Sequence, residues 1–545
     1  MNIVCVHVGL RGALEAAGHR CLDLRPPAGV IRLEPLLGDF VPDVIFQQET
    51  LGPRTIIADL GAFSCLKVFW SIDTHLNSFW HQYYARLFDL CCSTQKQWLP
   101  WFAARGLVQT AWLPWFGSSR PVAPWEERVH GLGFVGRITP ERPVRQWFAQ
   151  WLDRIGDVQV RQDLPHGQML DFYDKSRIVP NEAIFGEINF RLFEAASCGC
   201  AVLNPAVGHV EGLFEPDSEV ALYRDGAELA DWACRLRHND VLARLMGLRA
   251  WERIQREHLP EHRARALLAR VGNLERAAQT GPAARVALWL TLFSLWEGGR
   301  LPLPMEEMER VFSSLPLEAE VLAVLLRLAA KKGADALMRL AVPVARHGQC
   351  ANSLEVNLAA SLGAVRYGDM SVARLFLLRH LRHGDSPRHS FEDSPLSICL
   401  AWARELQHMG RESRPGFVFN PEKHLPGSAL ECLVLASEYA PDDRSVYRAM
   451  HRLLARTNGW EGLRLKALSY LSLRERENWL LGLELGVTNC RAFRVREGIE
   501  EIMLARNAAR SQDQSGRFEA ALAALDVSGH IRRLLVLSDH ASDNA

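Results

Sequence analysis

The chain has 545 residues, 48% of them apolar, with 63 basic and 63 acidic side chains. This length predicts three or four domains of about 150 residues, with enough apolar residues for real cores. Balanced charge provides no net field to attract polyanions, so nucleic acid is not an expected partner. No stretch approaches 18 apolar residues and the first residues lack a basic region, so we expect no membrane span, no signal peptide and a cytoplasmic protein.

The first 118 residues alternate short apolar runs with helical patterns. The runs at 3–8, 41–46, 65–71 and 89–93 are typical of strands, and a helical stretch follows each of them. Such alternation predicts a parallel sheet covered by helices on both faces. Residues 1–118 are therefore expected to form an N-terminal Rossmann-like domain.

A second alternation of strands and helices occupies residues 125–278. It follows a stretch rich in Pro, Gly and Ser at residues 112–124, which we interpret as a hinge. The pattern predicts a second Rossmann-like domain. Because open parallel sheets bind ligands outside the carboxyl ends of their strands, we expect the two domains to face a cleft.

The strand signal ends before residue 280, and residues 285–545 are expected to be all-α. Residues 357–369, together with Ala373, Phe376 and Pro387, resemble one tetratricopeptide unit, and residues 516–522 resemble part of another. The remaining helix pairs lack that signature. A degenerate tetratricopeptide-like repeat is the prediction, and an irregular α-bundle is the alternative.

The most informative segment is residues 184–203. It predicts a helix that carries Asn189, Arg191 and Glu194, stops at Gly199 and leads into an apolar strand. This segment resembles the donor-binding segment of GT-B glycosyltransferases, and most closely the CgeB-like, or spore-maturation, branch with its pattern N-x-R-x-F-E-A-x-A-x-G. Residues 136–137, 173–181, 219–223 and 257–263 resemble further motifs of that family, in the same order. The resemblance covers roughly residues 1–278 and implies a GT-B fold with glycosyl transfer from a nucleotide-diphosphate sugar. It also implies that residues 1–118 form the acceptor-side domain and that residues 125–278 bind the nucleotide sugar.

The resemblance implies which residues bind the donor. Glu194 would accept hydrogen bonds from the ribose diol, although an ion pair with Arg191 is the structural alternative. Arg137 and Arg142 would hold the diphosphate through bidentate guanidinium contacts, whereas solvated surface arginines are the alternative. Asn181, Asn189 and Arg191 complete the donor-binding set, and for Arg191 we favour a role in bracing the helix.

The chain departs from one feature of many retaining GT-B enzymes. Those enzymes carry two glutamates eight positions apart, and here Gly186 stands eight positions before Glu194. Glu187 is one step from that position and is our catalytic candidate there. This departure leaves an alternative function open, in which a catalytically impaired relative binds sugar nucleotides within a repeat scaffold.

Acceptor-side candidates follow two strands of the first domain. Asp73 and His75 come after the run at 65–71, in a stretch that resembles the family motif W-x-x-D-x-P with His75 in place of proline. Asp73 is our candidate general base, with a helix N-cap as the alternative. His7 and Gly9 lie at the first strand-to-helix turn, where they could contact acceptor or phosphate or serve the structure alone.

The sequence contains no Asp-x-Asp pair, which usually holds a divalent cation on a sugar diphosphate. We therefore expect neither a metal site nor a cofactor, and a metal-independent, hexosyltransferase-like enzyme. Its predicted partners are a nucleotide sugar and a protein or surface-glycan acceptor, which the helical repeats could recruit.

Overall fold

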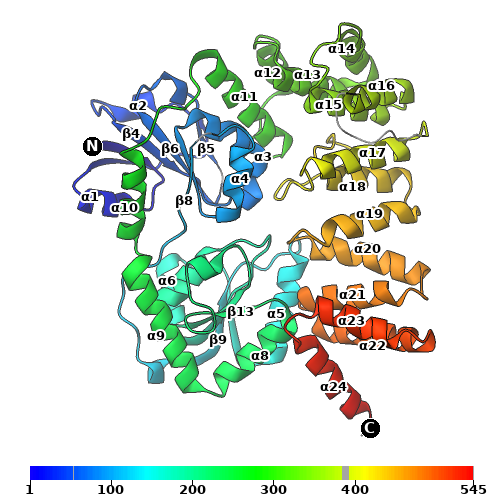
Figure 1. Ribbon diagram of the computed structural model, residues 1–545. Helices are drawn as coiled ribbons and strands as arrows, with labels where there is room; N and C mark the ends of the chain where they lie inside the picture. The colour runs from blue at the N-terminus through cyan, green and yellow to red at the C-terminus, as the bar shows by residue number, and fades with distance from the viewer. Residues whose placement is uncertain (53, 108, 383–391, 544–545) are drawn as a thin grey trace. The chain divides into compact units, whose positions relative to one another are not determined.

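The computed structural model describes residues 1–52, 54–107, 109–382 and 392–543, with side chains described up to residue 537 (Figure 1). The chain folds into two compact units. The first combines Met1–Leu113 with Ala266–Ala449, and the second combines Pro114–Arg265 with Met450–Ala545. Each unit therefore contains one α/β domain and part of the C-terminal helical region.

The α/β domain of the first unit has a six-stranded parallel sheet in the order β2-β1-β4-β6-β7-β8. Its strands are β1 (Asn2–Val6), β2 (Arg20–Leu24), β4 (Val44–Gln48), β6 (Leu66–Ser71), β7 (Leu90–Ser93) and β8 (Thr110–Trp112). A two-stranded parallel sheet pairs β3 (Gly29–Ile31) with β5 (Thr55–Ile57). The helices of this domain are α1 (Arg11–Ala16), α2 (Glu34–Leu37), α3 (Thr74–Tyr84) and α4 (Leu99–Ala103), and α10 (Pro260–Val271) leads back into this unit.

The α/β domain of the second unit has a five-stranded parallel sheet in the order β10-β9-β11-β12-β13. Its strands are β9 (His130–Val135), β10 (Val158–Arg161), β11 (Ser176–Pro180), β12 (Ala201–Pro205) and β13 (Ala221–Tyr223). Its helices are α5 (Pro143–Ile155), α6 (His166–Asp174), α7 (Phe190–Ser197), α8 (Gly226–Arg237) and α9 (Asp240–Glu257). The two parallel α/β domains confirm the predicted fold class.

The rest of the chain is helical in the described residues, as predicted. The helices are α11 (Gly281–Glu297), α12 (Met305–Phe312), α13 (Ala319–Lys332), α14 (Ala334–Arg346), α15 (Leu354–Arg366), α16 (Met370–Leu381), α17 (Pro395–His408), α18 (Ala429–Tyr439), α19 (Arg444–Leu454), α20 (Glu461–Arg474), α21 (Trp479–Arg491), α22 (Val495–Ser511), α23 (Ser515–Leu525) and α24 (His530–Asp543). Neighbouring helices pack as pairs, for example α15 with α16, α17 with α18 and α21 with α22. Pro387 lies outside the described residues, and the type of repeat stays a prediction. None of the described helices has the length and apolar character needed to cross a membrane.

In the first unit the α/β domain and the helical region share one hydrophobic core. Phe79 of α3 packs with Leu290 and Phe293 of α11, and its ring also meets Phe417 edge-on at 5.5 Å. Phe417 belongs to the long segment between α17 and α18, which reaches α3 (Figure 1). The neighbouring Gly416 adopts a φ of 77°, and a Cβ there would overlap the carbonyl oxygen of Leu76 in α3.

Basic side chains of the helical region hold the main chain of the same segment. Arg327 and Lys331 of α13 donate hydrogen bonds to the carbonyls of Leu425 and Lys423, both at 2.6 Å, and Arg366 of α15 donates to that of His424 at 2.7 Å. These contacts join the segment to two helices as well as to α3. The helical region therefore docks firmly on the first α/β domain.

Candidate functional site

The carboxyl edge of the second sheet brings most of the candidate donor residues together. Arg137 follows β9, and Asn181 follows β11 directly. Asn189 is the N-cap residue of α7, while Arg191 and Glu194 lie on the first turns of that helix. Because β9 and β11 are adjacent in the sheet, residues far apart in sequence converge at one edge.

Arg191 connects α7 to the ends of both strands. Its Nη1 donates to Oδ1 of Asn181 at 2.5 Å, and its Nε and Nη2 donate to the carbonyl of Val135 at 3.0 and 2.8 Å. The guanidinium also lies over the ring of Phe134, 4.6 Å from the centroid. Asn181 in turn donates to Oδ1 of Asn204 at 2.6 Å. These contacts give Arg191 and Asn181 a bracing role, and their contact with a donor stays a prediction.

Glu194 is a largely buried carboxylate with few stabilising contacts to the described residues. Its side chain is 16% exposed, and Nε2 of the His166 imidazole lies 3.6 Å from its Oε1. No described residue donates a hydrogen bond to the carboxylate, because the Arg191 guanidinium is directed to Val135 and Asn181. Burial raises the pKa of Glu194 to about 7, and the charge of Arg191 opposes that shift. Such a group gains from a ligand that donates hydrogen bonds.

Arg137 and Arg142 form the basic side of this edge. Arg137 is 70% exposed and donates through Nε and Nη2 to Oδ1 of Asp163 at 3.1 and 3.0 Å. Arg142 is the N-cap residue of α5, so it lies where the helix directs its free N–H groups. Burial, and then the charge of Arg145, lower the pKa of Arg142. Guanidinium groups and the first turn of a helix both attract anions.

A buried ion pair that was not predicted from the sequence lies at the same edge. Nε of Arg145 donates to Oε2 of Glu182 at 2.5 Å, and both side chains are less than 10% exposed. Burial raises the pKa of Glu182, while Arg145 opposes this shift. Both residues adjoin predicted site residues, since Glu182 follows Asn181 and Arg145 is three positions after Arg142. The only sign of this ion pair in the sequence was that both charged residues stand beside apolar segments.

Glu187 and Asn189 fix the segment between β11 and α7. The carboxylate of Glu187 accepts hydrogen bonds from the backbone N–H groups of Ile184 at 3.0 Å and Phe185 at 2.7 Å. Asn189 donates through Nδ2 to the carbonyl of Glu182 at 2.9 Å, while its buried Oδ1 has no hydrogen-bond partner among the described residues. Glu187 therefore stabilises its own loop, and its catalytic role stays a prediction.

The acceptor-side candidates lie at the carboxyl edge of the first sheet. Asp73 occupies the N-cap position of α3 without a side-chain capping hydrogen bond, and His75 is buried in the first turn. His7 follows β1 with a φ of 58°, and its Nε2 lies 3.1 Å from Oγ1 of Thr55. The N–H of Gly9 donates to Oε1 of Gln48 at 2.8 Å. All four candidates therefore lie at this edge of the sheet, and their roles in acceptor binding and catalysis stay predictions.

A buried glutamate that was not predicted from the sequence, Glu49, holds the backbone of Asp73 in place. Oε2 of Glu49 accepts hydrogen bonds from the N–H groups of Ile72 at 2.8 Å and Asp73 at 2.9 Å. Oε1 accepts from Nδ2 of Asn77 at 2.6 Å and lies 3.2 Å from Nε2 of His81. Burial alone would raise the pKa of Glu49, but His81, the N–H of Asp73 and the charge of Arg54 outweigh it and lower that pKa. Its place directly after β4 was the only sequence signal.

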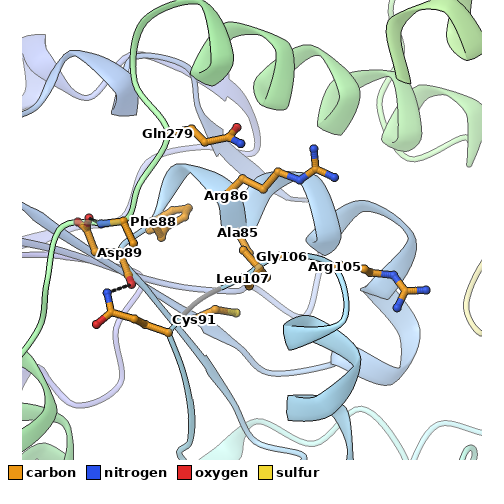
Figure 2. Close-up of a pocket in the computed structure, with 11 residues that line it drawn as sticks. Ala85, Arg86, Phe88, Asp89, Cys91, Arg105, Gly106, Leu107 and Gln279 are labelled. Atoms are coloured by element: carbon orange, nitrogen blue, oxygen red, sulfur yellow. Dashed lines mark hydrogen bonds between the residues drawn. The ribbon is translucent and has the colours of Figure 1, made fainter. Parts of the chain in front are cut away.

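A cavity of about 320 Å³ lies elsewhere, at the amino end of β7 (Figure 2). Its charged side chains are engaged within the protein. Asp89 accepts hydrogen bonds from the N–H groups of Ala277 and Ala278, and Arg86 pairs with Glu320. In Figure 2 the side chains of Arg86 and Arg105 point away from Asp89. This cavity therefore lies at the opposite end of the first sheet from the acceptor-side candidates. Nowhere in the described ranges do three potential metal-ligating His, Cys, Asp or Glu side chains form a group that could hold a metal ion.

One part of the chain is similar to a known protein family. Residues 124–269 match the family described as glycosyl transferase-like. No curated protein matches the chain at a significant level. Sucrose-phosphate synthase from Thermosynechococcus elongatus is 13% identical over 49% of this chain and 98% of its own, with a TM-score of 0.40. A glycosyltransferase from Rickettsia africae is 10% identical over 50% of this chain and 98% of its own, with a TM-score of 0.39.

A third solved structure is Anabaena HepE in complex with UDP and glucose. It is 13% identical over 50% of this chain and 100% of its own, with a TM-score of 0.36. The family match spans the sheet of the second unit and every candidate donor residue from Arg137 to Glu194. Residues 124–269 are therefore the part of the chain that is similar to glycosyl transferase-like proteins.

Proposed function

We propose that this protein is a GT-B glycosyltransferase that moves a sugar from a nucleotide-diphosphate sugar to a protein or surface-glycan acceptor without a metal ion. The observation that carries the proposal is Glu194, a largely buried carboxylate with no hydrogen-bond donor among the described residues, within a glycosyl transferase-like segment. A ribose diol supplies two hydroxyl donors to such a carboxylate.

The remaining donor groups divide the work at the carboxyl edge. Arg137, Arg142 and the first turn of α5 would receive the diphosphate, since guanidinium groups and helix N-termini both favour phosphate oxygens. Arg191 and Asn181 would hold α7 against β9 and β11, and so fix the position of Glu194. This division predicts that nucleoside binding and diphosphate binding depend on different residues.

In the transfer step a hydroxyl oxygen of the acceptor bonds to the anomeric carbon, and the bond from that carbon to the diphosphate oxygen breaks. Asp73 would take the proton of the acceptor hydroxyl, and the basic groups would stabilise the negative charge of the departing nucleoside diphosphate. Glu49 would act as a positioning residue, because it accepts hydrogen bonds from the N–H groups of Ile72 and Asp73. Glu187 is the second catalytic candidate.

The helical region would hold the acceptor, and the protein would act in the cytoplasm. The alternative, a sugar-nucleotide-binding module that has lost transfer activity, is favoured by two features at one place. Position 186 is a glycine, and the carboxylate of Glu187 is already engaged with its own loop. Binding without turnover is the behaviour that this alternative predicts.

The test is hydrolysis of nucleotide-diphosphate sugars by the purified full-length protein, measured with and without EDTA. Mass spectrometry of ligands retained during purification would first identify the base and the sugar. We expect slow hydrolysis that survives chelation and is lost in Asp73→Asn. Binding of nucleoside diphosphate without hydrolysis would support the alternative, and the absence of any nucleotide binding would refute both.

A further inference from the structure

The loop between α19 and α20 docks directly on the segment between β11 and α7. Gly459 adopts a φ of 83°, and a Cβ there would overlap the carbonyl of Ile184 and the ring of Phe185. The rings of Phe185 and Trp460 meet edge-on with centroids 5.6 Å apart. Only a glycine permits this approach of two main chains, so the contact is encoded in the sequence.

Asn458 in that loop occupies the space beside Gly186. Nδ2 of Asn458 lies 2.8 Å from where a Cβ at position 186 would stand, and Gly186 itself has a φ of 74°. A larger residue at 186 would therefore be strained and would collide with the Asn458 amide. The Asn458 side chain is exposed, and no described residue forms a hydrogen bond with its amide. The amide thus fills the volume that a side chain at 186 would need.

The first turn of α20 extends the same contact. Glu461 accepts a hydrogen bond from the N–H of Gly459 at 3.2 Å. A Cβ at Gly462 would lie 3.7 Å from Cγ of Pro143, the first residue of α5. Burial raises the pKa of Glu461, and the charge of Glu182 adds to the shift. The helical region therefore lies beside both the segment with Glu187 and the start of α5, where we place the diphosphate.

We propose that the helical region forms one wall of the donor site, and that Asn458 is a specificity-determining residue whose side-chain amide hydrogen-bonds a hydroxyl of the donor sugar. The inference rests on the proposed function. An amide offers two N–H donors and one acceptor oxygen, so it can bind adjacent sugar hydroxyls in either sense. It carries no charge and cannot stabilise positive charge at the anomeric carbon. Asn458 should therefore govern sugar affinity and selectivity rather than the rate of bond cleavage.

The test compares Asn458→Ala with the wild-type protein in calorimetric titrations with UDP and UDP-glucose. If another base binds better among UDP, GDP, ADP and dTDP, that diphosphate and its glucose conjugate replace the uridine pair. We expect Kd for UDP-glucose to rise about 3- to 10-fold and Kd for UDP to stay within about twofold, as for the loss of one neutral hydrogen bond. Asn478→Ala is the matched control, because Asn478 is an exposed residue of the same unit whose side chain makes no capping hydrogen bond.

A second variant tests the electrostatic surroundings. Asn458→Asp keeps the shape but places a carboxylate near Glu182, Glu187 and Glu461, so it should weaken UDP-glucose more than Asn458→Ala does. If Asn458→Ala lost affinity for UDP and UDP-glucose equally, or for neither, the role of Asn458 in sugar binding would be overturned. The proposed function would not be affected by that result. A wild-type protein that binds none of the four diphosphates would instead overturn the proposed function, and this inference with it.

Discussion

Glu194 should make the ligand-free protein less stable and the nucleotide complex tighter, and its pKa allows both effects to be measured. Its pKa rises from 4.5 to about 7 in the folded protein, chiefly through burial. Between these two values the unfolded chain releases the proton while the folded chain retains it. The free energy of unfolding therefore falls as pH rises from about 4.5 to about 7. One pKa unit corresponds to about 1.4 kcal/mol, so the full penalty is up to about 3 kcal/mol above pH 7.

Replacing the carboxylate should remove that penalty. We expect Glu194→Gln to be more stable than the wild-type protein by up to about 3 kcal/mol at pH 8 and nearly equal to it at pH 4.5. Urea denaturation of both proteins across this range measures the difference. Glu252→Gln is the matched control, because Glu252 is an exposed helical residue of the same unit.

Glu194→Ala should in turn bind nucleoside 10- to 150-fold more weakly, as for about 1.5 to 3 kcal/mol of charge-assisted hydrogen bonding. Uridine is the better probe, because it lacks a phosphate that titrates in the same pH range. Its affinity for the wild-type protein should rise as Glu194 ionises near pH 7. Parallel stability profiles for the wild-type protein and Glu194→Gln, together with unchanged uridine affinity in Glu194→Ala, would refute the assignment of Glu194 to the ribose.

Three further measurements test other parts of the structure. Arg137→Ala should weaken UDP binding and leave uridine binding unchanged, because the exposed guanidinium is available to the diphosphate. Calorimetric losses of affinity that are equal for UDP and uridine would contradict this. Gly416→Ala should lower the free energy of unfolding by about 2 kcal/mol more than Gly368→Ala does. Gly368 has a similar φ, but a Cβ there would meet no atom within 4 Å. Equal denaturation midpoints for the two variants would contradict the overlap with Leu76. A fragment of residues 1–280 should aggregate, because it exposes the core face that α11 covers, and a soluble, cooperatively folded fragment would show that this face tolerates water.

The sequence predicted the parts of the fold that repeat a strong local pattern. The four predicted strands of the first domain correspond to β1, β4, β6 and β7, whose side chains are almost entirely buried. It missed β2, because Arg20–Leu24 is partly exposed at the sheet edge and has mixed polarity. The three-residue strands β3, β5 and β8 are too short to carry a periodic signal.

The candidate site was predictable where its functional residues lie on one segment of the chain. It was not predictable where their hydrogen-bond partners come from distant segments. Glu194 and Arg191 lie on one helix, so the motif places both. Which group pairs with Arg191 depends on the ends of β9 and β11, and only the folded chain reveals that Val135 and Asn181 are those partners. The long-range contacts of Asn458 have the same origin, because no local pattern links residue 458 to residue 186.

The helical region docks on each α/β domain by the same physical device. Gly416 in the first unit and Gly459 in the second have positive φ angles, and a Cβ at either position would overlap a backbone carbonyl of the α/β domain. The carbonyl in the first unit belongs to Leu76, one turn from Asp73, and the carbonyl in the second belongs to Ile184, in the loop that Glu187 closes. Both contacts therefore lie beside candidate catalytic residues. A shift of the helical region within either unit would move the backbone that positions those residues, so the helices can influence the chemistry without contacting the reacting atoms.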